Sequence, residues 1–268
     1  MLQIEEKDIL MVPVPIGYKR QVPYIRDYCF HTVNDGVMVY VRDQAYTHLF
    51  LKNPGQICRG SPFGEKLYKL AREGPPSWLE VGSWNGLGST TCILDGFRDC
   101  GFAHQKHLLS FEIDPVMQHA AASNLATHPA FSSVLFIHKK LSSGGAVAEE
   151  FPLDLHMDGD DVSLQNDQHY LIHFERERSL FHTTEPYVPA GPIEVALLDG
   201  GEYSGYNDWL QLPKEHLKWI CLDDAHTTKS RRVVTELDAS GNWICVARGD
   251  DRNGWAIYRH RDAFPIDL

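Results

Sequence analysis

Short apolar runs alternate with amphipathic stretches over the last two thirds of the chain. Each run ends at a glycine or at a charged residue, the pattern of strands buried in a parallel sheet. Between the runs, apolar residues recur at helical spacing, and proline or glycine marks the helix ends. The predicted strands cover residues 78–82, 107–114, 133–139, 193–199 and 218–224, and the predicted helices cover 63–72, the stretch after Gly88, 115–125 and 227–239.

The end of the chain departs from this alternation. Two apolar stretches, 242–248 and 254–260, are separated only by Gly-Asp-Asp-Arg-Asn, which is short enough for a hairpin. The pattern therefore predicts an α/β fold of the Rossmann-like kind, with a seven-stranded, mostly parallel sheet whose last strand is antiparallel. Ligands of such sheets bind beyond the carboxyl ends of the strands, so the residues at those ends are the informative ones.

Two regions lack this regularity. Residues 1–75 have turn residues and aromatics, with one short candidate strand at 37–43, and are predicted to form an N-terminal extension or cap. Residues 76–268 form the predicted ligand-binding domain, interrupted by an insertion at about 143–191 that contains the acidic stretch 156–161. We expect a helix and an excursion there rather than a separate domain.

The composition limits the kinds of molecule and metal that the protein is expected to bind. The 268 residues include 25 Lys and Arg against 36 Asp and Glu, a net charge of −11, which argues against nucleic acid as a partner. The one basic cluster, 229–232, is interpreted as a solvated helix face. His169 and His173 are four residues apart but have no evident third ligand, so zinc is not expected.

The cysteines and the apolar runs bear on location. No Cys-x-x-Cys pair occurs, and Cys92, Cys221 and Cys245 lie in apolar segments and are predicted to be small core residues. No run approaches the roughly 18 apolar residues of a membrane span, and the N-terminus lacks an apolar signal core. We expect a cytoplasmic protein without a membrane partner, and a homo-oligomer is compatible with the sequence.

A glycine-rich turn follows the first predicted strand. Glu80 stands near the end of that strand, and Gly82, Gly86 and Gly88 follow it before the next helix begins. Glycines there let the backbone approach a ligand closely and let the helix present its N-terminal amides. A tight turn between strand and helix is the simpler alternative.

A carboxylate closes the second strand. Glu112 stands where a nucleotide-binding sheet accepts hydrogen bonds from the ribose hydroxyls, with Asp114 as its rival two residues on. An exposed acid at the strand end is the alternative.

Together these segments resemble the ordered motifs of class I S-adenosylmethionine-dependent methyltransferases. The motifs are LEVGSWNGLGST (79–90), SFEIDP (110–115), ALLDGGEY (196–203) and CLDDAH (221–226). The resemblance implies that S-adenosylmethionine is the cofactor and that the segment 140–142, with Ser142, contacts adenine. It extends to these cofactor-binding residues: Glu80, Gly82, Ser83, Gly86, Gly88, Glu112, Ser142 and Asp199. It does not cover 1–60 or 143–190.

Three acids end two strands that we expect to be neighbours. Asp199 follows the fourth strand, and Asp223 and Asp224 end the fifth. Adjacent strands lie roughly 4.8 Å apart, so the three carboxylates can converge on Mg²⁺ or another divalent cation. The pattern is similar to metal-dependent O-methyltransferases of the catechol and the macrocin and mycinamicin type. Alternatively, Asp224 caps the following helix, or Lys229 or Arg231 supplies the positive charge.

One departure concerns the catalytic base. The sugar-modifying relatives have Asp-Gly-Asp-x-Tyr, whereas this chain has Gly201 where the second acid would stand. Glu202, His226 and Lys229 are the candidate catalytic residues beside Asp199. Tyr203, Tyr206 and Trp209 either wall an acceptor pocket or pack a helix onto the sheet.

The expected function is transfer of a methyl group to a hydroxyl of a small molecule, such as a sugar, a phenol or a natural product, with divalent-metal assistance. A metal would polarise the hydroxyl and a base would take its proton. Two alternatives remain at this point: a nicotinamide-dependent dehydrogenase, and a cofactor-binding partner subunit without activity.

Overall fold

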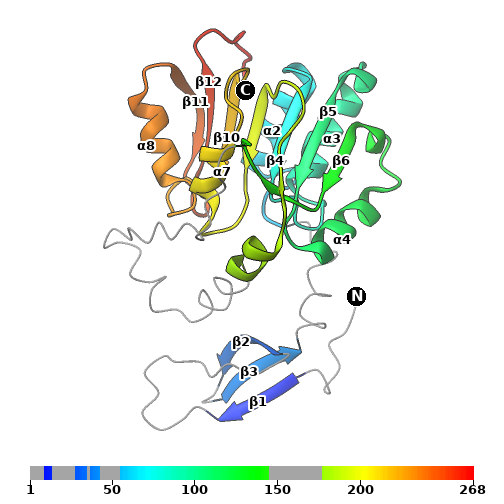
Figure 1. Ribbon diagram of the computed structural model, residues 1–268, viewed down its shortest axis with the longest axis vertical. Helices are drawn as coiled ribbons and strands as arrows, with labels where there is room; N and C mark the ends of the chain where they lie inside the picture. Colours follow the sequence, from blue (N-terminus) through cyan, green and yellow to red (C-terminus); the bar gives the residue numbers. More distant parts are fainter. Residues whose placement is uncertain (1–8, 14–27, 35–36, 43–54, 145–176) are drawn as a thin grey trace.

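A computed structural model describes residues 9–13, 28–34, 37–42, 55–144 and 177–268, the first three ranges as backbone only. Its largest element is a seven-stranded sheet in the order β11-β12-β10-β9-β4-β5-β6 (Figure 1). The strands are β4 (Ser77–Val81), β5 (His107–Phe111), β6 (Val134–Ile137), β9 (Val195–Leu198), β10 (Trp219–Asp223), β11 (Trp243–Gly249) and β12 (Trp255–His260).

Strand direction confirms the predicted fold class. Strands β6, β5, β4, β9 and β10 pair in parallel, and β12 runs antiparallel to both of its neighbours. The chain therefore builds outward from β4 to β6, returns to β9 on the other side of β4, and inserts its last strand between β10 and β11. This is the α/β, Rossmann-like arrangement that the sequence pattern predicts, and its strand order reverses between β4 and β9.

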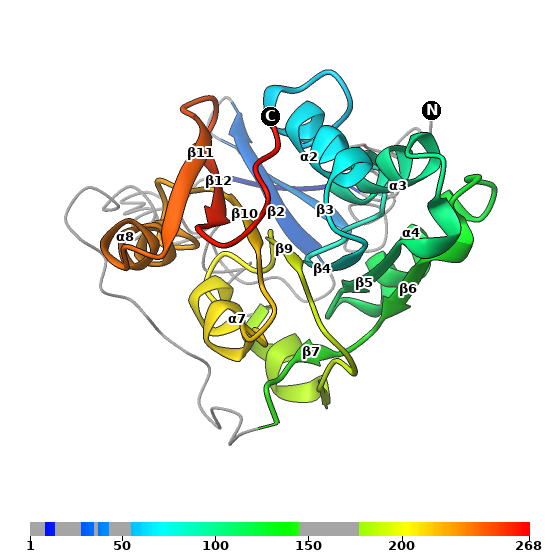
Figure 2. The same cartoon turned by 90° about the horizontal axis from the view of Figure 1, so that it is seen from above.

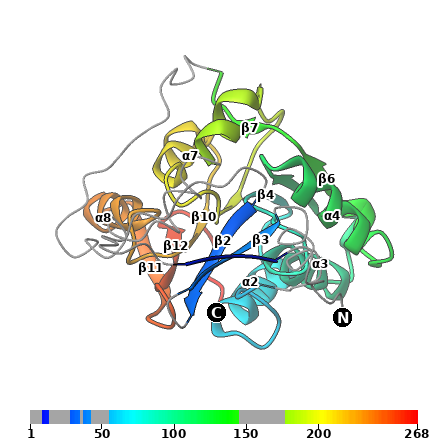
Figure 3. The same cartoon turned by 90° about the horizontal axis from the view of Figure 1, so that it is seen from below.

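Helices cover both faces of the sheet (Figures 2 and 3). They are α2 (Pro62–Glu73), α3 (Ser89–Asp99), α4 (Pro115–Leu125), α7 (Gly205–Gln211) and α8 (Arg231–Ala239). Because side chains alternate along a strand, each strand serves two cores. Trp78 packs with residues of α2 and α3 on one face, whereas its neighbour Leu79 packs with residues of α7 and α8 on the other.

Caps explain where two of the helices begin. The Ser61 side chain accepts a hydrogen bond from the Gly64 amide at 3.1 Å, with a proline as the first residue of α2. Asp114 does the same for α4, accepting from the Val116 amide at 2.9 Å. The predicted helices at 63–72 and 115–125 are confirmed.

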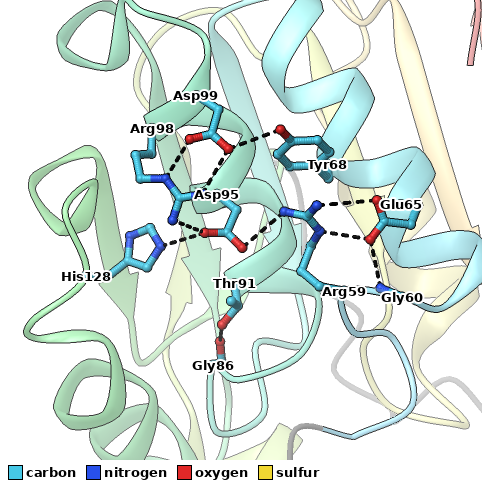
Figure 4. A network of polar contacts seen from close by, with 10 residues as sticks. All are labelled: Arg59, Gly60, Glu65, Tyr68, Gly86, Thr91, Asp95, Arg98, Asp99 and His128. Carbon is cyan, nitrogen blue, oxygen red and sulfur yellow. Dashed lines mark hydrogen bonds and ion pairs between the residues drawn. The ribbon is translucent and has the colours of Figure 1, made fainter.

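Helix α2 shares the core of the sheet domain. Phe63, Leu67 and Leu70 are buried beside residues of α3 and β4. Figure 4 shows the polar contacts that reinforce this packing: the Arg59 guanidinium donates to Glu65 at 3.0 Å and to Asp95 of α3 at 3.3 Å. The domain boundary at residue 75 stays a prediction, and the structure adds that α2 packs as part of the same core.

The N-terminal strands form a separate antiparallel sheet in the order β1-β3-β2. The predicted strand at 37–43 is β3 (Val37–Arg42), and it pairs with β1 (Ile9–Pro13) and β2 (Tyr28–Asn34), which the sequence pattern did not reveal. Two short strands, β7 (Lys140–Leu141) and β8 (Pro186–Tyr187), pair in parallel across the insertion. Residues 145–176, with the acidic stretch 156–161 and the pair His169 and His173, lie outside the described residues.

Three expectations are wrong. Cys92 and Cys221 are buried as predicted, but Cys245 is exposed, as is its neighbour Ile244, because β11 is an edge strand of the sheet. Helix α8 begins at Arg231 rather than at 227, because residues 224–230 form turns. Lys229 does not lie on a solvated face: only 5% of its side chain is exposed.

Within the described ranges, no helix is long and apolar enough to cross a membrane.

Candidate active site

A cavity of about 640 Å³ opens at the carboxyl ends of β4, β5, β9 and β10, where the strand order reverses. This is the position that the fold predicts for a ligand. The predicted site residues that line the cavity are Gly82, Ser83, Gly88, Glu112, Asp199, Glu202, Asp223, Asp224 and Lys229. Those outside its lining are Glu80, Gly86, Ser142 and His226.

Gly82 opens the turn after β4 in a conformation that favours glycine, with φ at 89°. A Cβ at this position would lie 2.0 Å from the Asp199 carbonyl oxygen at the end of β9. The glycine therefore lets two adjacent strand ends approach each other at the floor of the cavity.

Glu112 is held by the turn that it faces. Its carboxylate accepts hydrogen bonds from the Trp84 amide at 2.8 Å and from the Asp114 amide at 3.0 Å. Burial raises the pKa of Glu112 to about 7, although these amides favour the charged form. The rival Asp114 also lines the cavity but uses its carboxylate to cap α4.

Glu80 positions the turn from behind. Its fully buried carboxylate accepts hydrogen bonds from Ser89 at 2.7 Å, Thr90 at 2.8 Å and Ser110 at 2.7 Å. These hydroxyls belong to the start of α3 and to β5, so Glu80 joins β4 to both elements. Gly86 serves packing, since a Cβ there would lie 3.0 Å from the Ala121 Cα of α4.

The three acids meet as predicted, and Lys229 lies among them. Its Nζ lies 2.7 Å from Asp199 Oδ1, 3.1 Å from Asp224 Oδ2 and 4.0 Å from Asp223 Oδ2. Arg252, from the turn between β11 and β12, approaches Asp223 at 3.3 Å. Asp224 therefore pairs with Lys229 and does not cap the following helix, whose N-cap is at residue 230.

The charges in this cluster depend on one another. Burial raises the pKa of the Asp199 carboxyl, and the Lys229 ammonium opposes that rise. For Lys229, burial alone would lower the pKa, but Asp199 and Glu202 hold it well above its ordinary value. Asp224 adopts a left-handed backbone with φ at 49°, and its Oδ1 is buried without a hydrogen bond among the described residues. Strain and unsatisfied polar atoms of this kind concentrate at functional sites.

The candidate bases separate clearly. Glu202 lines the cavity, and burial raises its pKa while Lys229 opposes the rise. His226 lies outside the lining with half of its side chain exposed, and its Nε2 is 3.6 Å from Asp250. The structure thus brings Glu202 to the acidic cluster and leaves His226 away from it.

Glu177 also lines the cavity, although the sequence pattern did not mark it; it lies in the second half of the insertion. Residues 177–183 are helical, and the Glu177 carboxylate accepts hydrogen bonds from the amides of Ser204 at 2.8 Å and Tyr203 at 3.2 Å. Burial raises its pKa. Glu177 carries no signal in the sequence, because the insertion has no periodicity and no motif.

Two further charged residues line the cavity, and the sequence pattern did not predict either of them. Asp208 is buried on α7, where the sequence gives it no strand end to mark it, and Arg252 sits in the hairpin turn. The nearby aromatics turn out to pack helices: Tyr206 and Trp209 donate to Glu236 of α8 at 2.6 and 2.9 Å. Neither they nor Tyr203 lines the cavity.

Comparisons with known proteins concern the fold. No family model matches the chain, and no curated protein matches its sequence. An O-methyltransferase from Bacillus cereus, solved with S-adenosylhomocysteine, is similar at 14% identity over 81% of this chain and 88% of that one, with a TM-score of 0.48. A putative O-methyltransferase from Klebsiella pneumoniae has 12% identity over 80% and 86%, with a TM-score of 0.48. A methyltransferase from Geobacter sulfurreducens has 11% identity over 81% and 88%, with a TM-score of 0.47.

Proposed function

We propose that this chain is an S-adenosylmethionine-dependent methyltransferase that methylates a hydroxyl of a small molecule. One observation carries the proposal: in a class I methyltransferase fold, a single cavity joins the glycine turn and Glu112 at one end to the acidic cluster around Lys229 at the other. The first end has the chemistry to hold a nucleoside and the second has the chemistry to activate an alcohol.

The turn and Glu112 hold the cofactor in this proposal. Gly82 leaves room for close backbone approach, and the start of α3 at Ser89 lines the same cavity. Ser83 has a buried hydroxyl with no hydrogen-bond partner among the described residues, and it lines the cavity too. A ligand oxygen or amine would satisfy that hydroxyl, which fits a polar amino-acid moiety. Glu112 has carboxylate lone pairs left for the ribose hydroxyls.

The acidic end activates the acceptor. When bound, the cofactor supplies an electrophilic methyl group on a sulfonium. Glu202 takes the proton of the acceptor hydroxyl, so that the oxygen can form the new bond to carbon while the carbon–sulfur bond breaks. A positioned general base is worth roughly 10²–10⁴ in rate. Asp199 orients the reacting groups in this proposal, since its carboxylate belongs to the acidic end and its carbonyl lies beside Gly82.

The expected divalent cation does not fit the residues as they lie. The carboxylate oxygens of Asp199, Asp223 and Asp224 are within 4.8 Å of one another, which is a plausible ligand set. However, the Lys229 ammonium is inserted among them and hydrogen bonds to two of the three. No metal therefore takes part in the proposed mechanism.

A methyl-transfer assay tests the function. We expect isotope-labelled methyl to pass from S-adenosylmethionine to at least one compound in a panel of sugars, phenols and other alcohols. Glu202→Gln should lower that rate by about 10²-fold or more, while cofactor affinity stays within a factor of about two. Glu215→Gln, at an exposed position outside the cavity, is the matched control.

The assay also separates the alternative of an inactive partner subunit. Binding of the cofactor with no transfer to any acceptor would favour that alternative over the enzyme. An unchanged rate in Glu202→Gln, with transfer detected, would remove Glu202 from the role of base and leave the enzyme assignment standing.

A further inference from the structure

We infer that Lys229 is the built-in cation of the active site and takes the place of the divalent metal among the three strand-end carboxylates. The inference deepens the proposed function, and its catalytic part rests on that function. Its metal-binding part rests only on the arrangement of this cluster.

The first support is position. Lys229 Nζ donates to Asp199 at 2.7 Å and to Asp224 at 3.1 Å, and Asp223 follows at 4.0 Å. A metal would have to lie within about 2.0–2.6 Å of the same oxygens. The ammonium and a metal therefore compete for one position.

The second support is charge. Three carboxylates within a few ångströms would repel one another strongly, because two like charges about 4 Å apart cost about 4 kcal/mol at an effective dielectric of 20. Lys229 and Arg252 supply two positive charges against the three negative ones. Among these five groups the two cations offset two of the three negative charges, so the carboxylates already have counter-charges without a metal.

The third support is burial. The side chains of Lys229, Asp223 and Asp224 are each only 5% exposed. A metal that displaced the ammonium would leave a buried lysine charge without its partners, and breaking a buried pair in this way is costly.

The chain also leaves room for this lysine. At the start of α7, a Cβ on Gly205 would lie 2.6 Å from the Lys229 carbonyl oxygen and 3.1 Å from its Cγ. Because glycine has no side chain, position 205 leaves space for Lys229 to pass close to the start of α7 and reach the cluster. Turns at 224–230 complete the route: the Thr227 amide donates to the Asp224 carbonyl at 3.0 Å.

The arrangement gives Lys229 a chemical role. An ammonium has three N–H donors, and two are engaged by Asp199 and Asp224. Because Lys229 also lines the cavity, the third donor can point at the acceptor oxygen and stabilise its developing negative charge while Glu202 takes the proton. Lys229 remains protonated throughout, so the proton balance of the reaction is unchanged.

A manganese titration tests the inference. Mn²⁺ is added to the wild-type protein and to Lys229→Met without cofactor or acceptor, and the bound fraction is read from the electron paramagnetic resonance of the free ion. We expect no stoichiometric binding by the wild type up to millimolar Mn²⁺. In Lys229→Met the carboxylates lose their ammonium, and binding should tighten by at least about tenfold.

Two further variants make the titration specific. Adding Asp223→Asn to Lys229→Met should abolish the gained binding. Lys106→Met removes another buried lysine, whose ammonium donates to backbone carbonyls at the end of α2, and should gain no binding. Circular dichroism before each titration confirms that the variants are folded.

The outcomes are decisive in both directions. Tight, stoichiometric Mn²⁺ binding by the wild type that Asp223→Asn removes would overturn the inference, as would a folded Lys229→Met that binds no more Mn²⁺ than the wild type. Because the titration needs neither cofactor nor acceptor, it can succeed or fail independently of methyl transfer. Turnover that survives EDTA in the wild type is the expected result in the catalytic assay.

Discussion

The Glu177 carboxylate lies where a side chain at position 201 would begin. A Cβ added to Gly201 would be 2.0 Å from Glu177 Oε1 and 2.6 Å from Oε2. The insertion thus delivers a carboxylate beside Gly201, the position at which the sequence departs from the Asp-Gly-Asp-x-Tyr pattern. The absence of a side chain at Gly201 is what leaves space for the Glu177 carboxylate.

This relationship predicts coupling between the two positions. Gly201→Ala should push the Glu177 carboxylate off the amides of Ser204 and Tyr203, at a cost of about 1.5–3 kcal/mol in the free energy of unfolding. In the Glu177→Ala background the same substitution should cost under about 0.5 kcal/mol. Chemical denaturation of the double-mutant cycle measures both values.

The exposed Glu185 provides the control for that cycle. Glu185→Ala removes a glutamate of the same region that does not contact position 201, so it should leave the cost of Gly201→Ala unchanged. Equal costs in the wild-type and the Glu177→Ala backgrounds would contradict the relationship.

A second prediction concerns the close approach of β4 and β9. Gly82→Ala combines an unfavourable backbone angle with a Cβ only 2.0 Å from a carbonyl oxygen, so it should cost more than about 3 kcal/mol. Gly101→Ala has a similar φ of 77° but open space around its Cβ, and should cost about 1–2 kcal/mol. Thermal unfolding of both variants isolates the effect of the contact, and equal losses would count against it.

The strand ends were predictable for a physical reason. Runs buried on both faces must be apolar, and the residues that end them mark one edge of the sheet, so Glu112, Asp199, Asp223 and Asp224 could be found without coordinates. The reversal of direction at β12 followed from the short turn before it. These signals are local, and each lies within a few residues of its element.

The remaining site residues depend on contacts between distant segments. Glu177 reaches the cavity only because 177–183 packs near 203–204, and no local pattern encodes that. Lys229 looked like part of a solvated basic cluster, since its burial depends on Asp199 at the end of β9 as well as on the nearby Asp223 and Asp224. His226 stands beside Asp224 in the sequence, yet the turn directs it outward.

A third prediction follows from the pKa of Glu112. With its folded-state pKa raised from 4.5 to about 7, the folded protein retains a proton that the unfolded chain loses above pH 4.5. The stability contribution of Glu112 is therefore largest at low pH and is lost as the pH rises through about 7. Ribose hydroxyls donate to the ionised carboxylate, so cofactor binding should follow the opposite trend.

Calorimetry measures that trend. The affinity for S-adenosylhomocysteine should rise roughly tenfold between pH 6 and pH 8 in the wild type, as the ionised fraction of Glu112 increases. In Glu112→Gln the affinity should be lower and independent of pH over this range. A pH dependence that persists in Glu112→Gln would assign the titration to another group.

A fourth prediction concerns α7 and α8. Glu236 accepts hydrogen bonds from both Tyr206 and Trp209, so Glu236→Ala should lower the free energy of unfolding by about 1–3 kcal/mol. Cofactor affinity should stay unchanged, because none of the three residues lines the cavity. If Glu236→Ala lost methyl transfer but kept its stability, Tyr206 and Trp209 would instead be assigned to an acceptor pocket.

The most direct test of the central claim is a calorimetric titration of the wild-type protein with S-adenosylhomocysteine, and in parallel with NAD⁺. We predict a single site for S-adenosylhomocysteine, weakened by about 1.5–3 kcal/mol in Glu112→Ala, and no binding of NAD⁺. Absence of S-adenosylhomocysteine binding at millimolar concentration, or saturable binding of NAD⁺ that Glu112→Ala abolishes, would contradict the assignment.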